Sequence, residues 1–192
     1  MRKVIANEFL TLDGTAQAPG GPDEDTSGGF QHGGWHMKYG EGSGVRELIA
    51  EAGGFLLGRR TYEIFAGYWP DAPEDVQEIA EPLNTKPKHV ASRTLAGPLE
   101  WQNSRLLTGA LPEAVAALKE EGGGDLLVIG STVLVQSLIQ HGLVDELRIM
   151  IAPLLVGGGK RIFPVDGALR PLRLVDHEVT GTGSIIATYT PA

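Results

Sequence analysis

The sequence contains no cysteine. That absence excludes disulfide bonds, thiol catalysis and every zinc or iron–sulfur site built on cysteine ligands. Basic residues are also scarce, since 16 Lys and Arg stand against 24 Asp and Glu and give a formal net charge of -8. A surface of this charge repels phosphate polymers, and no run of Lys and Arg is longer than a pair such as Arg59–Arg60. We therefore expect no nucleic-acid partner.

Long apolar runs are missing as well. No stretch approaches the ~18–20 residues of a membrane span, and the first residues of the chain show no pattern of a secretory cleavage site. The lack of cysteine fits a reducing compartment. We therefore predict a soluble chain with no membrane partner and a cytoplasmic location.

Several common site signatures are absent too. The chain has no G-x-G-x-x-G after a strand pattern and no G-x-S-x-G, and its one Gly–Lys pair, Gly159–Lys160, precedes an arginine instead of Ser or Thr. His32 and His36 are four residues apart, but the two glycines between them disfavour a helix, and no third ligand is evident. We expect no metal site.

Glycine, by contrast, is abundant. The chain has 27 glycines in 192 residues, about twice the usual ~7%, without a regular period, which predicts many tight turns and close backbone contacts. The length favours one domain, and neither a linker nor an internal repeat interrupts it. Residues 1–192 are predicted to form a single domain.

Apolar patterns typical of strands and helices alternate along the chain. We expect strands at Val4–Leu12, Phe55–Leu57, Lys88–Ala91, Leu126–Ile129 and Leu147–Leu155. Helices are expected from a Ser43 cap to Ala52, at Tyr62–Ala66, at Glu74–Ala80 before Pro82, from Leu111 to the glycines at 122–124, and at Thr132–Gln140. Leu174–Val179 and Ser184–Tyr189 flank a Gly-Thr-Gly turn and predict an antiparallel hairpin. The order favours an α/β fold with a mainly parallel central sheet, flanked by helices, and antiparallel strands at one edge.

The segment from Thr15 to Gly42 is far longer than a usual connection. Loops of this length inside a domain are typical of lids and binding loops. Its aromatic residues Phe30, Trp35 and Tyr39 favour a mobile lid that closes over something flat and apolar. A plain surface insertion is the alternative interpretation.

A turn suited to anions follows the strand at Phe55–Leu57. Gly58, Arg59, Arg60 and Thr61 lead into a helix, whose first N–H groups and dipole attract negative charge. The hydroxyl and the two guanidinium groups add to that attraction. Alternatively, both arginines are solvated and Thr61 is only a helix cap.

Two further turns of this kind follow later strands. Gly130 and Ser131 are small enough for a phosphate to approach the backbone at a helix start, although a tight turn with Ser131 or Thr132 as a cap is an alternative. Ser92 and Arg93 offer a hydroxyl and a guanidinium, which suit a phosphate monoester. Three such turns on one sheet predict a long, multiply phosphorylated ligand such as a dinucleotide.

Motifs in the same order carry a family resemblance. They are Asn7 with Leu12-Asp13-Gly14, Gly58-Arg59-Arg60-Thr61-Tyr62-Glu63, Ala91-Ser92-Arg93, Ile129-Gly130-Ser131, Gly142-Leu143-Val144-Asp145-Glu146-Leu147, and Ile151 to Gly159. Nearly the whole chain thus resembles the dihydrofolate reductase-like superfamily. The resemblance is closest to the reductase domain of the bifunctional riboflavin-biosynthesis deaminase-reductase and its stand-alone relatives, and it implies their three-layer fold.

The resemblance also implies NADPH as the cofactor. Gly58 to Thr61 would hold the pyrophosphate, Ser92 and Arg93 the adenosine 2′-phosphate, and Ala6 would approach the nicotinamide carboxamide. Beneath the phosphates on the nicotinamide side would lie Gly130, Ser131, Thr132, Val133 and Leu134. Ser131 departs from the family pattern, which usually has a second glycine there.

The implied activity is the NADPH-dependent reduction of a small pyrimidine- or pterin-like compound. The nearest match is a 5-amino-6-(5-phosphoribosylamino)uracil reductase. A dihydrofolate or pteridine reductase ranks second, because the helix after the long loop offers only Glu47 and Glu51, and neither matches the carboxylate that anchors a pterin. A non-catalytic dinucleotide-binding protein is the third possibility.

Asp13 is the predicted catalytic residue. It ends the first strand beside the long loop, where a carboxylate can hydrogen-bond an amino-pyrimidine or a ribityl chain, although Asp–Gly is also a common turn.

The strand Leu147–Leu155 is more apolar than one sheet face explains. The resemblance also implies pairing of two chains around this strand. We therefore predict a homodimer through this strand. The alternative is that the helix from Thr132 and the hairpin cover it.

Overall fold

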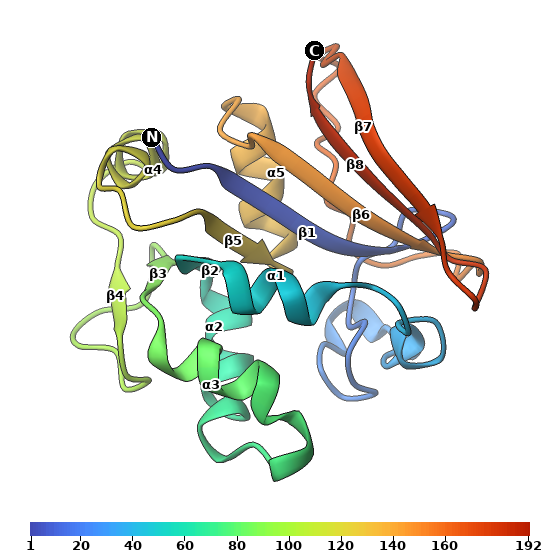
Figure 1. Cartoon of the computed structure of the whole chain (residues 1–192), viewed down its shortest axis with the longest axis horizontal. Helices are drawn as coiled ribbons and strands as arrows, with labels where there is room; N and C mark the ends of the chain where they lie inside the picture. Colours follow the sequence, from blue (N-terminus) through green and yellow to red (C-terminus); the bar gives the residue numbers. More distant parts are fainter.

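An eight-stranded sheet forms the centre of the computed structural model, which describes residues 1–192 (Figure 1). Its strand order is β4-β3-β2-β5-β1-β6-β8-β7. The strands are β1 (Val4–Thr11), β2 (Gly54–Gly58), β3 (Lys88–Ala91), β4 (Ser104–Leu106), β5 (Leu126–Ile129), β6 (Glu146–Ala152), β7 (Leu172–Val179) and β8 (Ile185–Pro191). In this order, every neighbouring pair from β4 across to β6 is parallel. Strand β8 is antiparallel to both of its neighbours, β6 and β7.

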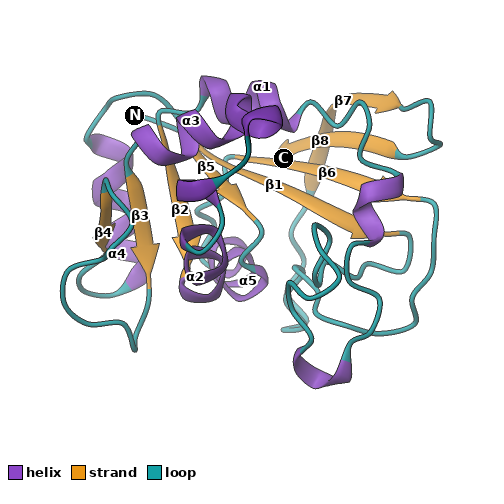
Figure 2. Ribbon diagram, turned by 90° about the horizontal axis from the view of Figure 1, so that it is seen from below, coloured by secondary structure: helices purple, strands orange, loops and turns teal.

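Helices cover both faces of this sheet. The α-helices are α1 (Val45–Glu51), α2 (Arg59–Ala66), α3 (Gln77–Thr85), α4 (Leu111–Glu120) and α5 (Thr132–Gln140), and short 3-10 turns lie at Ser27–Gly29, Trp35–Lys38, Trp69–Asp71 and Glu74–Val76. Figure 2 shows α1 and α3 on one side of the sheet, with α4 and α5 on the other. The predicted three-layer α/β fold with an antiparallel C-terminal hairpin is confirmed. None of the helices combines the length and the hydropathy that crossing a membrane requires.

The buried strand β5 shows how sequence and layers correspond. Its side chains alternate between the two faces, so that Leu126 and Val128 join the core beneath α4 and α5, while Leu127 and Ile129 join the core beneath α1, α2 and α3. A strand buried on both faces needs a continuous apolar run, which is why this segment was readable from sequence. Truncating any one of these leucines to Ala is expected to cost about 2–5 kcal/mol.

Helix α3 is longer than expected. It runs through Pro82 instead of ending at Ala80. Both Ala80 and Leu83 are fully buried, and this burial outweighs the one backbone hydrogen bond that the proline removes. The ammonium of Lys88 then donates to the carbonyl of Leu83 at 2.6 Å and lies 4.4 Å from the ring centre of Trp101. Burial lowers the pKa of Lys88 to about 8, and its donors satisfy the end of the helix.

Helix starts differ from the prediction in two places. Gly44, at φ +63°, is the N-cap residue of α1, so Ser43 does not cap that helix. Helix α2 begins at Arg59, directly after Gly58, and not at Tyr62. Strand β4 was not predicted, because it is a three-residue edge strand with a polar sequence. Short edge strands leave little hydrophobic pattern to read.

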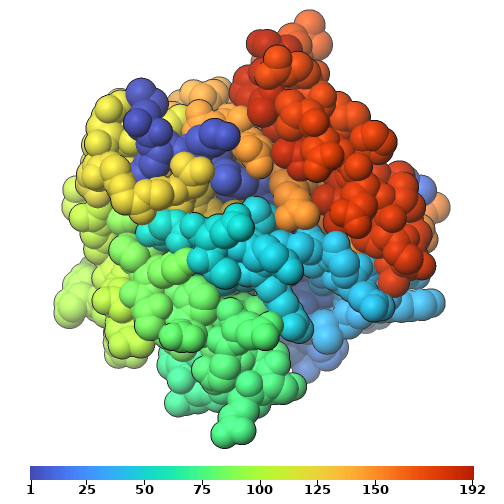
Figure 3. Space-filling model, viewed as in Figure 1, coloured from blue at the N-terminus to red at the C-terminus, as the bar shows by residue number.

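The predicted dimer surface lies inside the sheet. Strand β6 pairs with β1 on one side and β8 on the other, so it has no free edge, and its apolar sequence reflects this interior position. Exposed large apolar side chains gather instead on the hairpin and the segment before it: Leu155, Phe163, Val165, Leu169, Leu172, Leu174, Val175, Val179 and Ile185. Figure 3 shows the hairpin standing out at the edge of the molecule. The dimer predicted through Leu147–Leu155 therefore stays untested, and neither edge of this strand is open to a partner strand.

Candidate functional site

The carboxyl ends of three parallel strands open into one large cleft. Its volume is about 1810 Å³, which exceeds the ~300–1,000 Å³ of a pocket for one small molecule. In open α/β sheets ligands bind at this edge. All the residues predicted to bind the cofactor from the three turns line this cleft: Gly58, Arg59, Arg60, Thr61, Ser92, Arg93, Gly130, Ser131, Thr132, Val133 and Leu134. The structure thus brings all three turns together.

Two helices point their N-termini into the cleft. Helix α2 starts after Gly58 and α5 starts after Ser131, and no side chain caps either helix. Most of their first N–H groups therefore remain available, together with the positive ends of the helix dipoles. Arg59 is partly engaged by Glu63 at 3.6 Å in an exposed i,i+4 pair. This arrangement can receive the negative charge of phosphate groups.

Ser131 joins the two helix starts. Its hydroxyl accepts the backbone N–H of Gly58 at 2.8 Å, and its backbone has the left-handed values φ 67° and ψ 53°. A Cβ on Gly58 would lie only 3.2 Å from the Cβ and Oγ of Ser131. The serine therefore fills space that a second glycine would leave open, and Gly58 is required opposite it.

The turn after β3 carries a free cation. The hydroxyl of Ser92 accepts the backbone N–H groups of Thr94 at 3.1 Å and Leu95 at 2.9 Å, which fixes the turn. Arg93 belongs to none of the ion pairs in the structure. Its guanidinium is therefore available to a phosphate monoester at this end of the cleft.

A lid, residues 15–42, borders the opposite side of the cleft. It contains only two 3-10 turns, as the prediction of a long loop requires. Trp35 does not cover the cleft as expected: its indole is buried within the lid and donates to the carbonyl of Gln17 at 2.8 Å. The parts of the lid that line the cleft are Ala16–Asp25 and, later in the loop, His36, Met37 and the residues from Gly40 to Gly42.

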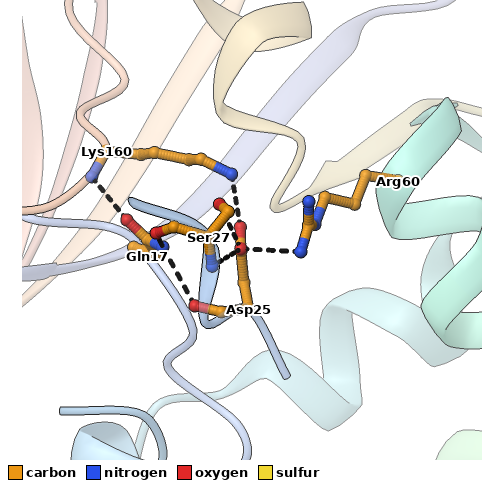
Figure 4. A network of polar contacts seen from close by, with 5 residues as sticks. All are labelled: Gln17, Asp25, Ser27, Arg60 and Lys160. Carbon is orange, nitrogen blue, oxygen red and sulfur yellow. Dashed lines mark hydrogen bonds and ion pairs between the residues drawn. The ribbon is translucent and has the colours of Figure 1, made fainter. Parts of the chain in front are cut away.

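Asp25 connects this lid to both sides of the cleft (Figure 4). Its carboxylate pairs with Arg60 at 2.8 Å and Lys160 at 2.5 Å and accepts the hydroxyl of Ser27 at 2.6 Å. Burial alone would raise the pKa of Asp25, but the bonds from Lys160 and Ser27 outweigh it and lower the pKa. Gln17 completes the network by donating to the Asp25 carbonyl at 2.9 Å. Two cations at the cleft are thus held by a carboxylate of the lid.

The other half of the cleft is largely apolar. Phe9 on β1 lies against His36, with ring centres 3.8 Å apart. Burial lowers the pKa of His36 to about 4, so the imidazole is neutral at pH 7. Apolar side chains from α1, α2, α3 and the two 3-10 turns between α2 and α3 continue this wall: Val45, Ile49, Ile64, Phe65, Trp69, Val76, Ile79 and Leu83. A flat, uncharged ring fits such a surface.

Glu8 also lines the cleft and was not singled out from the sequence. It lies in the middle of β1 and is only 2% exposed, and its Oε1 has no hydrogen-bond partner. Burial raises the pKa of Glu8 well above its usual value, although the backbone N–H of Gly130 opposes this shift. A carboxyl inside the mostly apolar run of Val4 to Leu12 was the available signal.

Two predicted site residues lie outside the cleft. Ala6 is fully buried in the core. The Asp13 carboxylate accepts the Thr11 hydroxyl at 2.5 Å and the Gly157 N–H at 2.8 Å, and the Thr11 bond is the main reason its pKa is lowered. Neither residue lines the cleft, so this geometry favours a structural role for Asp13. No group of three or more His, Cys, Asp or Glu side chains is placed to hold a metal ion.

Comparisons with known proteins agree with this architecture. The uncharacterized protein YyaP of Bacillus subtilis is 27% identical over 98% of this chain and 94% of its own length. A putative riboflavin biosynthesis protein from Shewanella sp. PV-4 superposes with a TM-score of 0.74 at 23% identity, over 99% of both chains. Dihydrofolate reductase from Enterococcus faecalis, in complex with NADP(H), gives a TM-score of 0.62 at 15% identity, over 98% of this chain and 96% of that one.

These solved structures establish the fold and confirm its dihydrofolate reductase-like class. A family model matches almost every residue of the chain, from the start of β1 to β8. The chain belongs to the family of the RibD C-terminal domain, whose model covers residues 2–186.

Proposed function

We propose that this protein is an NADPH-dependent reductase of a small pyrimidine- or pterin-like compound. The activity that we propose is most like that of a 5-amino-6-(5-phosphoribosylamino)uracil reductase. The observation that carries this proposal is the convergence of three phosphate-suited turns, from distant parts of the sequence, on one cleft with an apolar second half. Membership of the RibD C-terminal domain family supports it.

The residues present fit such a cofactor. The uncapped starts of α2 and α5 face the cleft from two sides, which suits a pyrophosphate. Thr61 and Thr132 add hydroxyl groups at these helix starts. Arg93, which has no ion-pair partner, suits the 2′-phosphate that distinguishes NADPH from NADH. Val133, an exposed apolar residue at the start of α5, gives a surface for the less polar parts of the dinucleotide.

The substrate would bind in the apolar half of the cleft. NADPH, when bound, supplies a hydride. The chain then has to align a flat ring beside that donor and exclude water. Phe9, His36 and the apolar wall from α1 to α3 are placed to hold such a ring. A neutral His36 makes this surface better suited to an uncharged heterocycle than to an anion.

A substrate screen tests the proposal. NADPH oxidation would be followed at its absorbance band with dihydrofolate, pterins and ribosylamino-pyrimidine phosphates as separate substrates. We expect turnover with a ribosylamino-pyrimidine. Turnover with dihydrofolate alone would favour the folate or pteridine reductase. Stoichiometric NADPH binding without turnover would favour a non-catalytic dinucleotide-binding protein, and no NADPH binding at all would refute the proposal.

We also propose that the protein is a homodimer, through β7 instead of β6. Strand β7 is one of the two edge strands of the sheet, and all of its residues are exposed. Leu172, Leu174, Val175 and Val179 contribute apolar surface there. A second copy that pairs along this edge would cover both the unpaired backbone groups and the apolar side chains.

A further inference from the structure

Glu8 has no counter-charge in the cleft. It belongs to none of the ion pairs of the structure. Two of the cations that line the cleft, Arg60 and Lys160, both bind Asp25. His36 lies against Phe9 and is neutral. A buried carboxylate without a counter-charge is costly, so such a group is stabilised in its acid form.

The place of Glu8 in the sheet sets what it can meet. Asn7 is the last β1 residue that pairs with β5, opposite Ile129. Glu8 is the next residue, so its side chain lies where β1 and β5 part and where the turn at Gly130 begins. Its pairing partner on the other side is Ile149 of β6. Glu8 therefore lies at the junction of the phosphate-suited turns and the lid.

We propose that Glu8 is a neutral carboxylic acid that recognises an amide or lactam group of the bound ligand. A carboxylic acid presents one O–H donor beside one carbonyl acceptor, and an amide presents the complementary N–H and C=O. The Oε1 atom of Glu8 is unpartnered and buried, which is costly unless a ligand completes its hydrogen bonds. Enzymes use neutral buried acids as donors in this way.

This inference rests on the proposed function, which supplies two ligands with that chemistry. One is the carboxamide of the nicotinamide, and the other is the lactam edge of a pyrimidine substrate. Loss of Glu8 would weaken binding of the cofactor in the first case and binding of the substrate in the second, so separate binding measurements distinguish them.

The experiment compares Glu8→Gln, which keeps a donor beside an acceptor, with Glu8→Leu, which removes both. Glu113→Leu, on the exposed start of α4, is the matched control. Calorimetry would measure the affinity of each protein for NADPH, for 2′-phospho-ADP-ribose, which lacks the nicotinamide, and for uracil in the presence of saturating NADP⁺. Circular dichroism would check that each variant is folded.

We expect Glu8→Leu to weaken the amide-bearing ligand about tenfold or more, and Glu8→Gln to stay within about threefold of wild type. If the amide belongs to the cofactor, NADPH weakens while 2′-phospho-ADP-ribose does not. If it belongs to the substrate, uracil weakens while NADPH does not. Wild-type affinities in Glu8→Leu, or equal losses in both variants, would overturn the inference.

A second measurement does not depend on the variants folding. Carboxyl carbon NMR of ¹³C-glutamate-labelled wild-type protein should show one glutamate in the acid form at pH 7, and its signal should shift when NADPH or uracil is added. If every glutamate signal is typical of a carboxylate at pH 7, the inference is overturned while the reductase proposal stays intact. Failure of wild type to bind NADPH would refute the reductase proposal, while the acid form of Glu8 would still be observed.

Discussion

The hydroxyl of Ser131 accepts the backbone N–H of Gly58 at 2.8 Å, so one side chain fixes the distance between the starts of α2 and α5. Ser131 makes this bond from a left-handed backbone, at φ +67°. For a residue with a Cβ that conformation costs about 1–2 kcal/mol. The two halves of the proposed phosphate site therefore act as one unit, held together by a strained residue.

Replacing Ser131 separates the bond from the strain. Ser131→Ala loses the acceptor and keeps the strained backbone, so we expect its free energy of unfolding to fall by about 1 kcal/mol. Ser131→Gly loses the acceptor but relieves the strain, and we expect a stability close to wild type. Urea unfolding measures both. A glycine variant less stable than the alanine variant would contradict this account.

Gly58→Ala is the matched test from the other side of the contact. Its new Cβ would lie 3.2 Å from Ser131, so the substitution should be more destabilising in wild type than in the Ser131→Gly background. A double-mutant cycle gives this coupling. Additive effects would mean that the two residues do not constrain each other.

Arg93 should set the preference for NADPH. Because its guanidinium can make a charge-assisted bond to the 2′-phosphate, wild type should bind NADPH roughly ten- to a hundredfold more tightly than NADH. Arg93→Ala should abolish most of that ratio. Arg59→Ala, at the proposed pyrophosphate site, should weaken both cofactors alike and preserve the ratio. Fluorescence titrations with both cofactors decide the point, and equal wild-type affinities would rule the prediction out.

Asp25 should hold the lid. Asp25→Asn weakens the ion pairs to Arg60 and Lys160, so residues 15–42 should exchange backbone hydrogens faster in the absence of ligand. NADPH should protect the wild-type lid, in keeping with the predicted mobile lid. Asp23→Asn, an exposed change in the same lid, should leave exchange as in wild type. If Asp25→Asn and wild type exchange alike, the network of Figure 4 does not control the lid.

His89 should make the protein sensitive to acid. Burial first, and then the nearby Arg105, lower the pKa of His89 to about 4, while its unfolded value is near 6.5. Between these values only the unfolded state takes up the proton, so this contribution to stability is lost as pH falls from 6.5 to 4. The slope is at most ~1.4 kcal/mol per pH unit.

The test is the difference in stability between wild type and His89→Gln, because other groups titrate in the same range. His36 acts in the same direction as His89, whereas Glu8, whose pKa is raised, acts in the opposite direction. Urea unfolding from pH 6.5 to 4 should show wild type losing stability relative to His89→Gln. Parallel curves would contradict the prediction.

The edge of β7 should carry the dimer. Light scattering at micromolar concentration should give about twice the 20.4 kDa of one chain. Introducing charge with Val175→Lys and Val179→Lys should return the mass to that of one chain. Leu12→Lys, at an exposed apolar residue outside β7 and β8, serves as the control and should remain dimeric. A wild-type mass near 20.4 kDa would end the idea.

Local patterns explain which parts of the site the sequence could predict. The turns at Gly58, Ser92 and Gly130 were readable because each directly follows a buried apolar strand. Asp13 stays a prediction, because an Asp–Gly pair at a strand end is compatible with both a turn and a site. The bond from the distant Gly157, which favours the structural role, is a tertiary contact that the local sequence does not show. Glu8 was missed because its environment is assembled by tertiary contacts between segments far apart in the chain. Register across the sheet, which places Glu8 beside Gly130, is not encoded locally.

The central position of β1 has a consequence for synthesis on the ribosome. Val4 pairs with Leu126, and the rest of β1 pairs with residues up to Ala152. At ~5–20 residues per second, Val4 is synthesised roughly 6–24 s before its partner Leu126. Throughout that interval the apolar first strand has no place in a sheet. An unpaired apolar strand of this kind is prone to aggregation, so the risk during synthesis is concentrated in the first residues of the chain.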